Sequence, residues 1–143
     1  MQTRLKKLYF TLVIPAIVGF LVVSLARSFA ETGLGDLGSS RLVSVALFVL
    51  AFAFGVALPI LHRTLFVSRT RGRKHVTAEE LLRFEELNLR IAMVAPYLAL
   101  AAYVLGIPRF HFFGTVIASL YAVYYFYPSD KRDRFERKVF RVE

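Results

Sequence analysis

The sequence contains no cysteine, which excludes disulfide bonds, thiolate metal sites and cysteine nucleophiles. Charged residues are also missing from four long apolar runs, residues 8–26, 42–61, 91–107 and 110–127. Proton- and ion-coupled carriers need ionisable side chains inside their spans, so these runs argue against ion-coupled transport. Glycine-rich phosphate loops and the motifs G-x-S-x-G and H-E-x-x-H are absent too. We predict no catalytic residue, metal ligand or cofactor, and we do not expect an enzyme.

Apolar residues dominate what is present: the chain is 57% hydrophobic and its mean hydropathy is +0.55. A domain of 143 residues cannot bury that much apolar surface, so lipid must cover the rest. Each apolar run approaches the roughly 20 residues that cross a hydrocarbon core of about 30 Å as a helix. We therefore predict an all-α integral membrane four-helix bundle, with residues 1–143 forming one domain.

The first run permits a second interpretation, a signal peptide. It follows three basic residues, and "SFA" at residues 28–30 fits a small-x-small cleavage site. The run is longer than the 7–15 apolar residues typical of signal peptides, which favours a retained span. A short glycine- and serine-rich outer loop is then predicted at residues 28–40.

Basic residues are distributed unequally between the two sides of the predicted bundle. The N-terminus, residues 62–90 and the tail carry three, seven and six Lys or Arg, sixteen of the nineteen in the chain. The other side receives only Arg27, Arg41 and Arg109. The positive-inside rule puts both termini and residues 62–90 in the cytoplasm, which predicts a multi-pass protein of the inner or plasma membrane. Orientation explains the net charge of +9, and without a recognition motif we do not expect nucleic-acid binding.

Residues 62–90 also predict a helix that extends the third span into the cytoplasm. Thr77 followed by Glu80 is a capping-box signature, which marks the start of a helix. Two acid-first i,i+4 pairs are expected to support it, Glu79 with Arg83 and Glu86 with Arg90. The apolar side chains of this extension are too many for a free solvated helix. They should rest on headgroups, the basic tail or another protein.

The tail after Pro128 resembles a short surface helix in its pattern. Ser129 can cap it, and Phe135, Val139 and Val142 follow at i, i+4 and i+7 among cations. This pattern favours a helix on an anionic membrane surface, and a solvated tail remains the alternative because the segment is so short. Nine basic residues are the candidate contacts with anionic lipid headgroups: Arg69, Arg71, Arg73, Lys74, Lys131, Arg132, Arg134, Arg137 and Lys138.

Small residues recur at helical spacing on the third and fourth runs. In lipid, helices associate through close packing at such positions. The same residues could pack the bundle internally or form a homo-oligomer interface. The candidate packing residues are Ala92, Ala95, Ala99, Ala102, Gly114, Ala118 and Ala122.

One polar feature is predicted inside the bundle. Pro96 leaves the Ala92 carbonyl without its helical donor, and Tyr97 and Tyr121 both lie about 9 Å deep at 1.5 Å per residue. This polar kink is a candidate binding spot for a lipid or quinone headgroup, with a satisfied structural kink as the alternative.

These observations favour a small non-catalytic membrane subunit or scaffold. It would bind a membrane or cytoplasmic partner through its basic, amphipathic inner face, as a homo-oligomer or within a larger membrane complex. The alternative function is an oligomeric channel or carrier for an uncharged or lipid-like solute.

Overall fold

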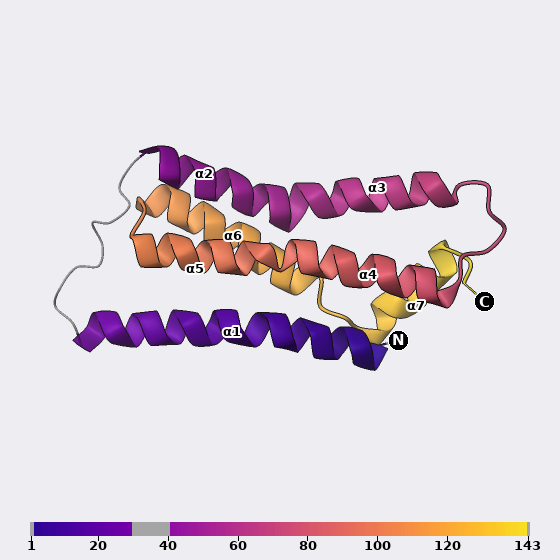
Figure 1. Cartoon of the computed structure of the whole chain (residues 1–143), viewed down its shortest axis with the longest axis horizontal. Helices are drawn as coiled ribbons and strands as arrows, with labels where there is room; N and C mark the ends of the chain where they lie inside the picture. The colour runs from indigo at the N-terminus through magenta and orange to yellow at the C-terminus, as the bar shows by residue number, and fades with distance from the viewer. Residues whose placement is uncertain (1, 30–40, 143) are drawn as a thin grey trace.

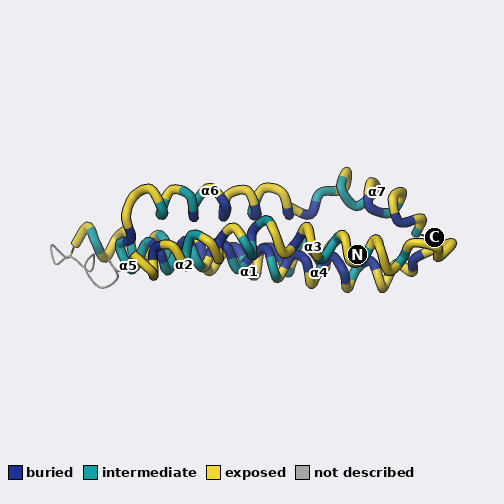
Figure 2. Tube along the Cα trace, turned by 90° about the horizontal axis from the view of Figure 1, so that it is seen from above, coloured by how far each residue is buried: buried dark blue, intermediate teal, exposed yellow. Residues whose placement is uncertain are grey.

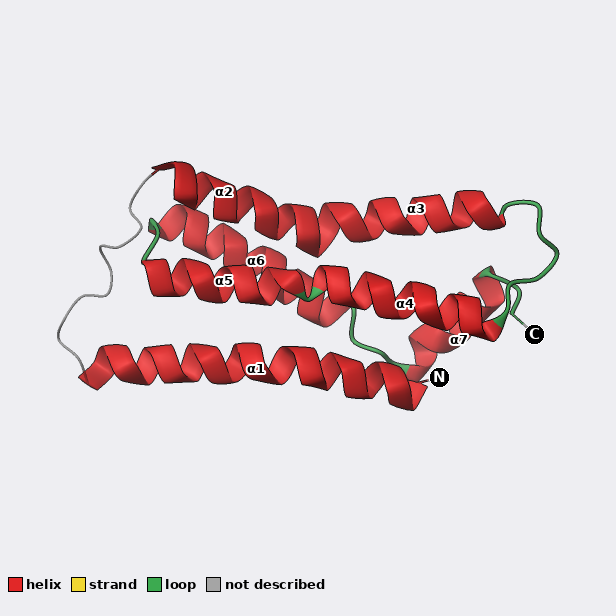
Figure 3. Ribbon diagram, viewed as in Figure 1, coloured by secondary structure: helices red, strands yellow, loops and turns green. Residues whose placement is uncertain are grey.

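The computed structural model describes residues 2–29 and 41–142. Of these residues 86% are helical and none lies in a strand, which confirms the all-α prediction. Most of the predicted outer loop, and Ala30 of the predicted cleavage site, lie outside the described residues. Figure 3 shows the helices and the short loops between them.

The chain forms seven α-helices and one π-helix within the described residues: α1 (Gln2–Phe29), α2 (Arg41–Phe52), η2 (Ala53–Ala57), α3 (Leu58–Thr70), α4 (Ala78–Ala92), α5 (Val94–Leu105), α6 (Arg109–Tyr125) and α7 (Asp130–Val139). Three helical segments are long and apolar enough to cross a membrane: Gln2–Phe29, Arg41–Thr70 and Ala78–Leu105. The described chain thus has the make-up of a multi-pass membrane protein.

The long segments lie side by side, with α4–α5 between α1 and the α2–α3 segment (Figure 1). Helix α6 packs against α2 and α5, and Figure 2 shows α6 and α7 on one side of the layer that the other helices form. Both ends of the chain and the α3–α4 connection lie at the same end of the helices (Figure 1).

The second long segment, which contains the predicted span of residues 42–61, is not a regular α-helix throughout. Its π-helical turn has the Leu58 N–H donating to the Ala53 carbonyl, five residues back. Pro59 follows directly in the first turn of α3. A proline cannot donate to the carbonyl four residues earlier, that of Gly55, and its ring displaces that carbonyl. Pro59 therefore accounts for the wider turn.

The third segment breaks at Met93, between α4 and α5. The break precedes Pro96 by three residues because the proline ring opposes the Ala92 carbonyl. Helix α5 ends at Gly106, whose φ of 64° is left-handed, a conformation that glycine adopts without strain. The short connection that follows returns the chain as α6, antiparallel to α5, as predicted.

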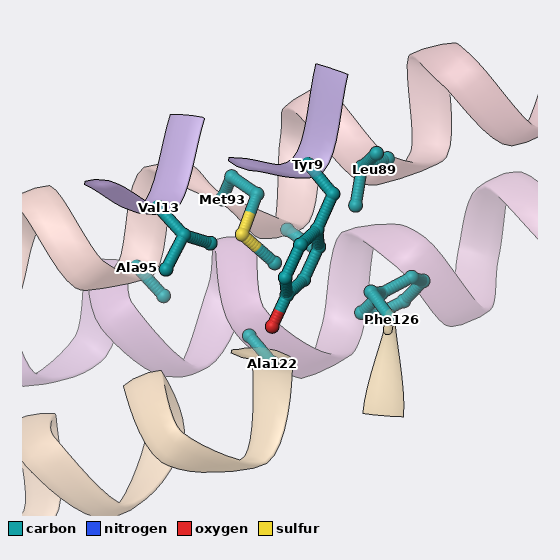
Figure 4. Packing of buried hydrophobic residues seen from close by; sticks show 8 residues of the cluster. Tyr9, Val13, Leu89, Met93, Ala95, Ala122 and Phe126 are labelled. Carbon is teal, nitrogen blue, oxygen red and sulfur yellow. The ribbon is translucent and has the colours of Figure 1, made fainter. Parts of the chain in front are cut away.

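Helix α1 docks through a cluster of buried residues near the N-terminal end of the helix (Figure 4). The Tyr9 ring points between Met93 and Phe126, and its hydroxyl donates to the Val123 carbonyl at 2.9 Å. Much of α1 and α6 is exposed and apolar elsewhere: Leu21 is 59% and Ile117 63% exposed. Exposed apolar faces of this kind fit a lipid solvent better than water.

Candidate functional site

The basic segments fold into one compact unit at the end of the helices where the termini lie. We call this unit the cap. It consists of the end of α3 up to Thr70, the connection of residues 71–77, the first turns of α4 from Ala78, and residues 130–142, which are α7 and the residues after it. Its core holds the buried residues Val76, Leu81, Phe84 and Phe140. The Phe84 ring stacks on Phe66 with centroids 4.2 Å apart. The apolar side chains of α4 thus rest partly on the tail, one of the three supports predicted for them.

The start of α4 confirms the predicted capping box. The Thr77 hydroxyl accepts from the Glu80 N–H, and the Glu80 carboxylate accepts from the Thr77 N–H. The predicted pair of Glu79 and Arg83 is also present, at 2.6 Å. Glu86 is different: it pairs at 2.8 Å with Arg4 of α1 and not with Arg90. Since an exposed i,i+4 pair contributes only a few tenths of a kcal/mol, a tertiary partner readily replaces it.

A buried ion pair fastens α7 to α3. The two guanidinium nitrogens of Arg63 contact the two carboxylate oxygens of Glu136 at 2.9 and 3.3 Å. Glu136 is 3% exposed and the Arg63 side chain 31% exposed, so removing Arg63 would leave an uncompensated buried carboxylate. This pair fixes which face of α7 points inward.

The predicted apolar stripe of the tail is divided by this docking. Ser129 caps α7 as predicted, accepting from the Arg132 N–H. Phe135 and Val139 are 58% and 47% exposed on the outer face, whereas Val142 packs against the cap core. An amphipathic helix therefore forms, but it ends at Val139. Val142 lies beyond the helix and faces inward, whereas the two apolar residues on the helix face outward.

The nine candidate lipid-contacting cations fall into two groups. Four make contacts within the chain: Arg73 pairs with Glu80, Arg137 pairs with Asp133, Arg132 donates to the Tyr125 carbonyl, and Arg134 donates to the Asp130 carbonyl. The other five are exposed: Arg69, Arg71, Lys74, Lys131 and Lys138. The exposed cations of α7 flank Phe135 and Val139, giving a basic surface with an apolar centre.

Glu85 is a second buried carboxyl of the cap, in the charged half of α4 outside the apolar run. It is 8% exposed, and no ion pair to it is found among the described residues. Burial raises its pKa to about 7; Arg132 opposes the rise, and Glu136 and Asp133 add to it. The Glu85 carboxyl therefore keeps its proton to higher pH than an exposed glutamate does.

The small residues predicted to pack helices lie inside the single chain. Five of the alanines are fully enclosed or nearly so, with exposures of 0–1%: Ala92, Ala95, Ala99, Ala102 and Ala122. Ala118 is equally buried at 1%. Gly114 lies against Phe48, whose ring would be 2.1 Å from an added Cβ atom. These residues pack the end of α4, α5 and α6 against their neighbours in the same bundle.

The residues of the predicted polar kink go to different neighbours. Pro96 is buried, and the Tyr97 hydroxyl donates to the Leu12 carbonyl of α1 at 2.7 Å. Tyr121 stacks on Tyr125 with centroids 5.4 Å apart and lines a space between α3 and α6. The structure therefore does not bring Tyr97 and Tyr121 to a shared site.

Several polar residues of the interior escaped the sequence analysis: Tyr9, Arg63, Glu85, Asn88 and Glu136. A signal for two of them was present. Glu85 and Asn88 occupy positions in the same helical series as the buried residues Leu81, Phe84, Leu89 and Ala92. A polar residue in an apolar helical stripe indicates a buried polar site.

The histidines and acidic residues do not gather. His62 stacks on Phe84 with centroids 4.9 Å apart, and His75 shares a 3.3 Å hydrogen bond with the Arg141 carbonyl. Over residues 2–29 and 41–142, no three His, Asp or Glu side chains are placed to hold a metal ion.

Comparisons with known proteins do not assign the chain: no family model matches it, and neither a curated protein nor a solved structure does. Its function must therefore be argued from the cap and the bundle.

Proposed function

We propose that the chain is a non-catalytic membrane subunit or scaffold whose cap lies in the cytoplasm and binds a partner. The observation that carries this proposal is the outer face of α7. Phe135 and Val139 stay exposed there, although the buried Glu136 anchors the opposite face. An exposed apolar pair on a helix held in place, ringed by cations, is typical of an interaction surface.

Four spans with both termini cytoplasmic are part of this proposal. Helix α6 has 17 residues, about 26 Å at 1.5 Å per residue, close to a hydrocarbon core of about 30 Å. Both termini and the α3–α4 connection lie at one end of the helices, which supports an even number of crossings. The sixteen basic residues at that end support its cytoplasmic location in the inner or plasma membrane.

Cysteine labelling tests the topology, because the chain has no native thiol. Single cysteines at Ser68, beside the cap, and at Phe110, at the α5–α6 turn, are exposed to a membrane-impermeant maleimide in intact cells. Phe110 is 77% exposed, so its replacement should be accessible. We expect labelling of Phe110→Cys alone, with Ser68→Cys labelled only after lysis. Labelling of Ser68→Cys in intact cells would contradict the topology.

Co-purification tests the subunit function. After extraction in mild detergent, we expect a second protein chain in fixed proportion to this one. Phe135→Ser with Val139→Ser should release that chain, while Leu87→Ser, which changes an apolar α4 residue that is 48% exposed, should retain it. A pure homo-oligomer, or a partner that both sets of variants retain equally, would count against the proposal.

A further inference from the structure

A cleft opens on the side of the bundle next to the cap, between α3 and α6. One wall is the π-helical turn at Gly55 followed by Pro59, and the other carries Tyr121 and Tyr125. Ile60, Tyr121 and Tyr125 are 55%, 40% and 45% exposed, so the cleft opens outward between the helices. In the proposed topology this opening faces lipid at the depth of the cytoplasmic headgroups.

An unpaired acceptor lies at the inner side of the cleft. Asn88 is 4% exposed, and its Oδ1 atom has no hydrogen-bond partner among the described residues. A buried acceptor without a donor destabilises the fold, and a bound O–H group would remove that cost. The cleft measures about 20 Å³, enough for one oxygen the size of a water.

The cleft adjoins a basic recess of about 330 Å³, because Arg63 and Tyr125 line both. Lys131, Arg132 and Glu136 complete the charged lining of the recess. Glu136 occupies two of the five N–H donors of Arg63 and leaves the others available. The lining of the recess thus carries three cations, Arg63, Lys131 and Arg132, against one carboxylate, that of Glu136. The recess therefore favours an anion such as a phosphate.

We infer that the cleft and the recess together bind one anionic phospholipid whose headgroup carries a hydroxyl, as phosphatidylglycerol does. The phosphate lies among Arg63, Lys131 and Arg132, and the headgroup hydroxyl donates to Asn88 Oδ1. The acyl chains leave through the open side of the cleft, past Tyr121. This inference rests on the membrane location proposed above, and it adds the class of lipid and the residues that select it.

Lipid binding by the full chain in detergent, followed by native mass spectrometry, tests the inference. Three lipids separate the contribution of the headgroup hydroxyl from that of the negative charge. They are phosphatidylglycerol, phosphatidylethanol, which keeps the phosphodiester charge but lacks a hydroxyl, and phosphatidylcholine. We expect phosphatidylglycerol to bind about tenfold more tightly than phosphatidylethanol, which corresponds to one hydrogen bond to a buried acceptor. Both anionic lipids should bind more tightly than phosphatidylcholine.

Two variants assign these preferences to residues. Asn88→Leu should bind the two anionic lipids equally and still prefer them to phosphatidylcholine. Lys131→Gln with Arg132→Gln should weaken both anionic lipids, and Lys74→Gln, an exposed cation elsewhere in the cap, should weaken neither.

Equal binding of phosphatidylglycerol and phosphatidylethanol by the unaltered chain would overturn the inference without any variant. A hydroxyl preference that persists in folded Asn88→Leu would also overturn it. The proposed function fails separately, since lipid selection in detergent depends on neither the labelling pattern nor the co-purified chain.

Discussion

Replacing Glu85 by glutamine should stabilise the cap at alkaline pH. The carboxyl is buried between α4 and α7, and burial raises its pKa from 4.5 to about 7. Arg132 and Arg137 of α7 oppose this rise, and Asp133 and Glu136 add to it. Because the folded pKa lies above the unfolded one, the neutral form is favoured by folding. The cap is therefore most stable below pH 4.5 and loses stability as pH rises towards 7.

The size of the effect follows from the two pKa values. A change from 4.5 to about 7 corresponds to about 3 kcal/mol against the ionised form. Glutamine cannot ionise, so Glu85→Gln should recover about that amount above neutral pH and little at pH 4. In hydrogen exchange this corresponds to roughly a hundredfold slower opening of the cap, if the cap opens as a local unit.

Hydrogen exchange followed by mass spectrometry measures this opening on the full chain in detergent. The variant and the unaltered chain are compared at the same pH, at pH 5 and pH 8.5, in peptides from α7. Glu86→Gln is the matched control, because its carboxylate pairs with Arg4. We expect that control to gain no protection at either pH. If Glu85→Gln exchanges like the unaltered chain at pH 8.5, the ionised Glu85 does not destabilise the cap. Burial would then not disfavour the charged form of this carboxyl, contrary to the prediction.

Two further changes test the helix contacts. Ala118→Leu should destabilise the bundle by about 1–3 kcal/mol, because the site is 1% exposed and cannot hold a larger side chain; thermal melting by circular dichroism measures this, and Ile117→Leu, at a site 63% exposed, should melt unchanged. Thr77→Ala should cost about 1 kcal/mol through loss of the capping box and speed exchange in the first turn of α4 about fivefold. Thr77→Ser, which keeps the hydroxyl, should preserve protection there. Equal exchange of the two variants would show that the hydrogen bond from the Glu80 N–H to the Thr77 hydroxyl does not stabilise the start of α4.

Local features of the fold were predictable because they depend on residues within one helical turn. The Thr77 capping box and the start of α4 are of this kind, as is the Ser129 cap of α7. The long apolar helices followed from composition alone. Pro59 was a visible signal for an irregular turn, but a proline does not say by itself whether a helix will kink, end or widen.

Features that depend on rotation and on distant partners were not predictable. Depth along a helix placed Tyr97 and Tyr121 at one level, but depth leaves open which neighbour each side chain faces. Tyr97 turns to α1 and Tyr121 to the α3 side. The pair of Arg63 and Glu136 joins residues 73 apart in the chain, and no sequence pattern connects them.

Three ion pairs at the cap end of the bundle join residues that are synthesised at different times. Arg4 pairs with Glu86, Lys6 with Asp130, and Arg63 with Glu136. In each pair the basic residue leaves the ribosome first and its acid much later, with α7 made after every other described helix. In the topology proposed above, the early cations are until then free to hold their segments on the cytoplasmic side during insertion. Glu86 of α4 then neutralises Arg4, and Asp130 and Glu136 of α7 neutralise Lys6 and Arg63, so under that proposal the same charges first orient the nascent chain and then hold the finished helices together.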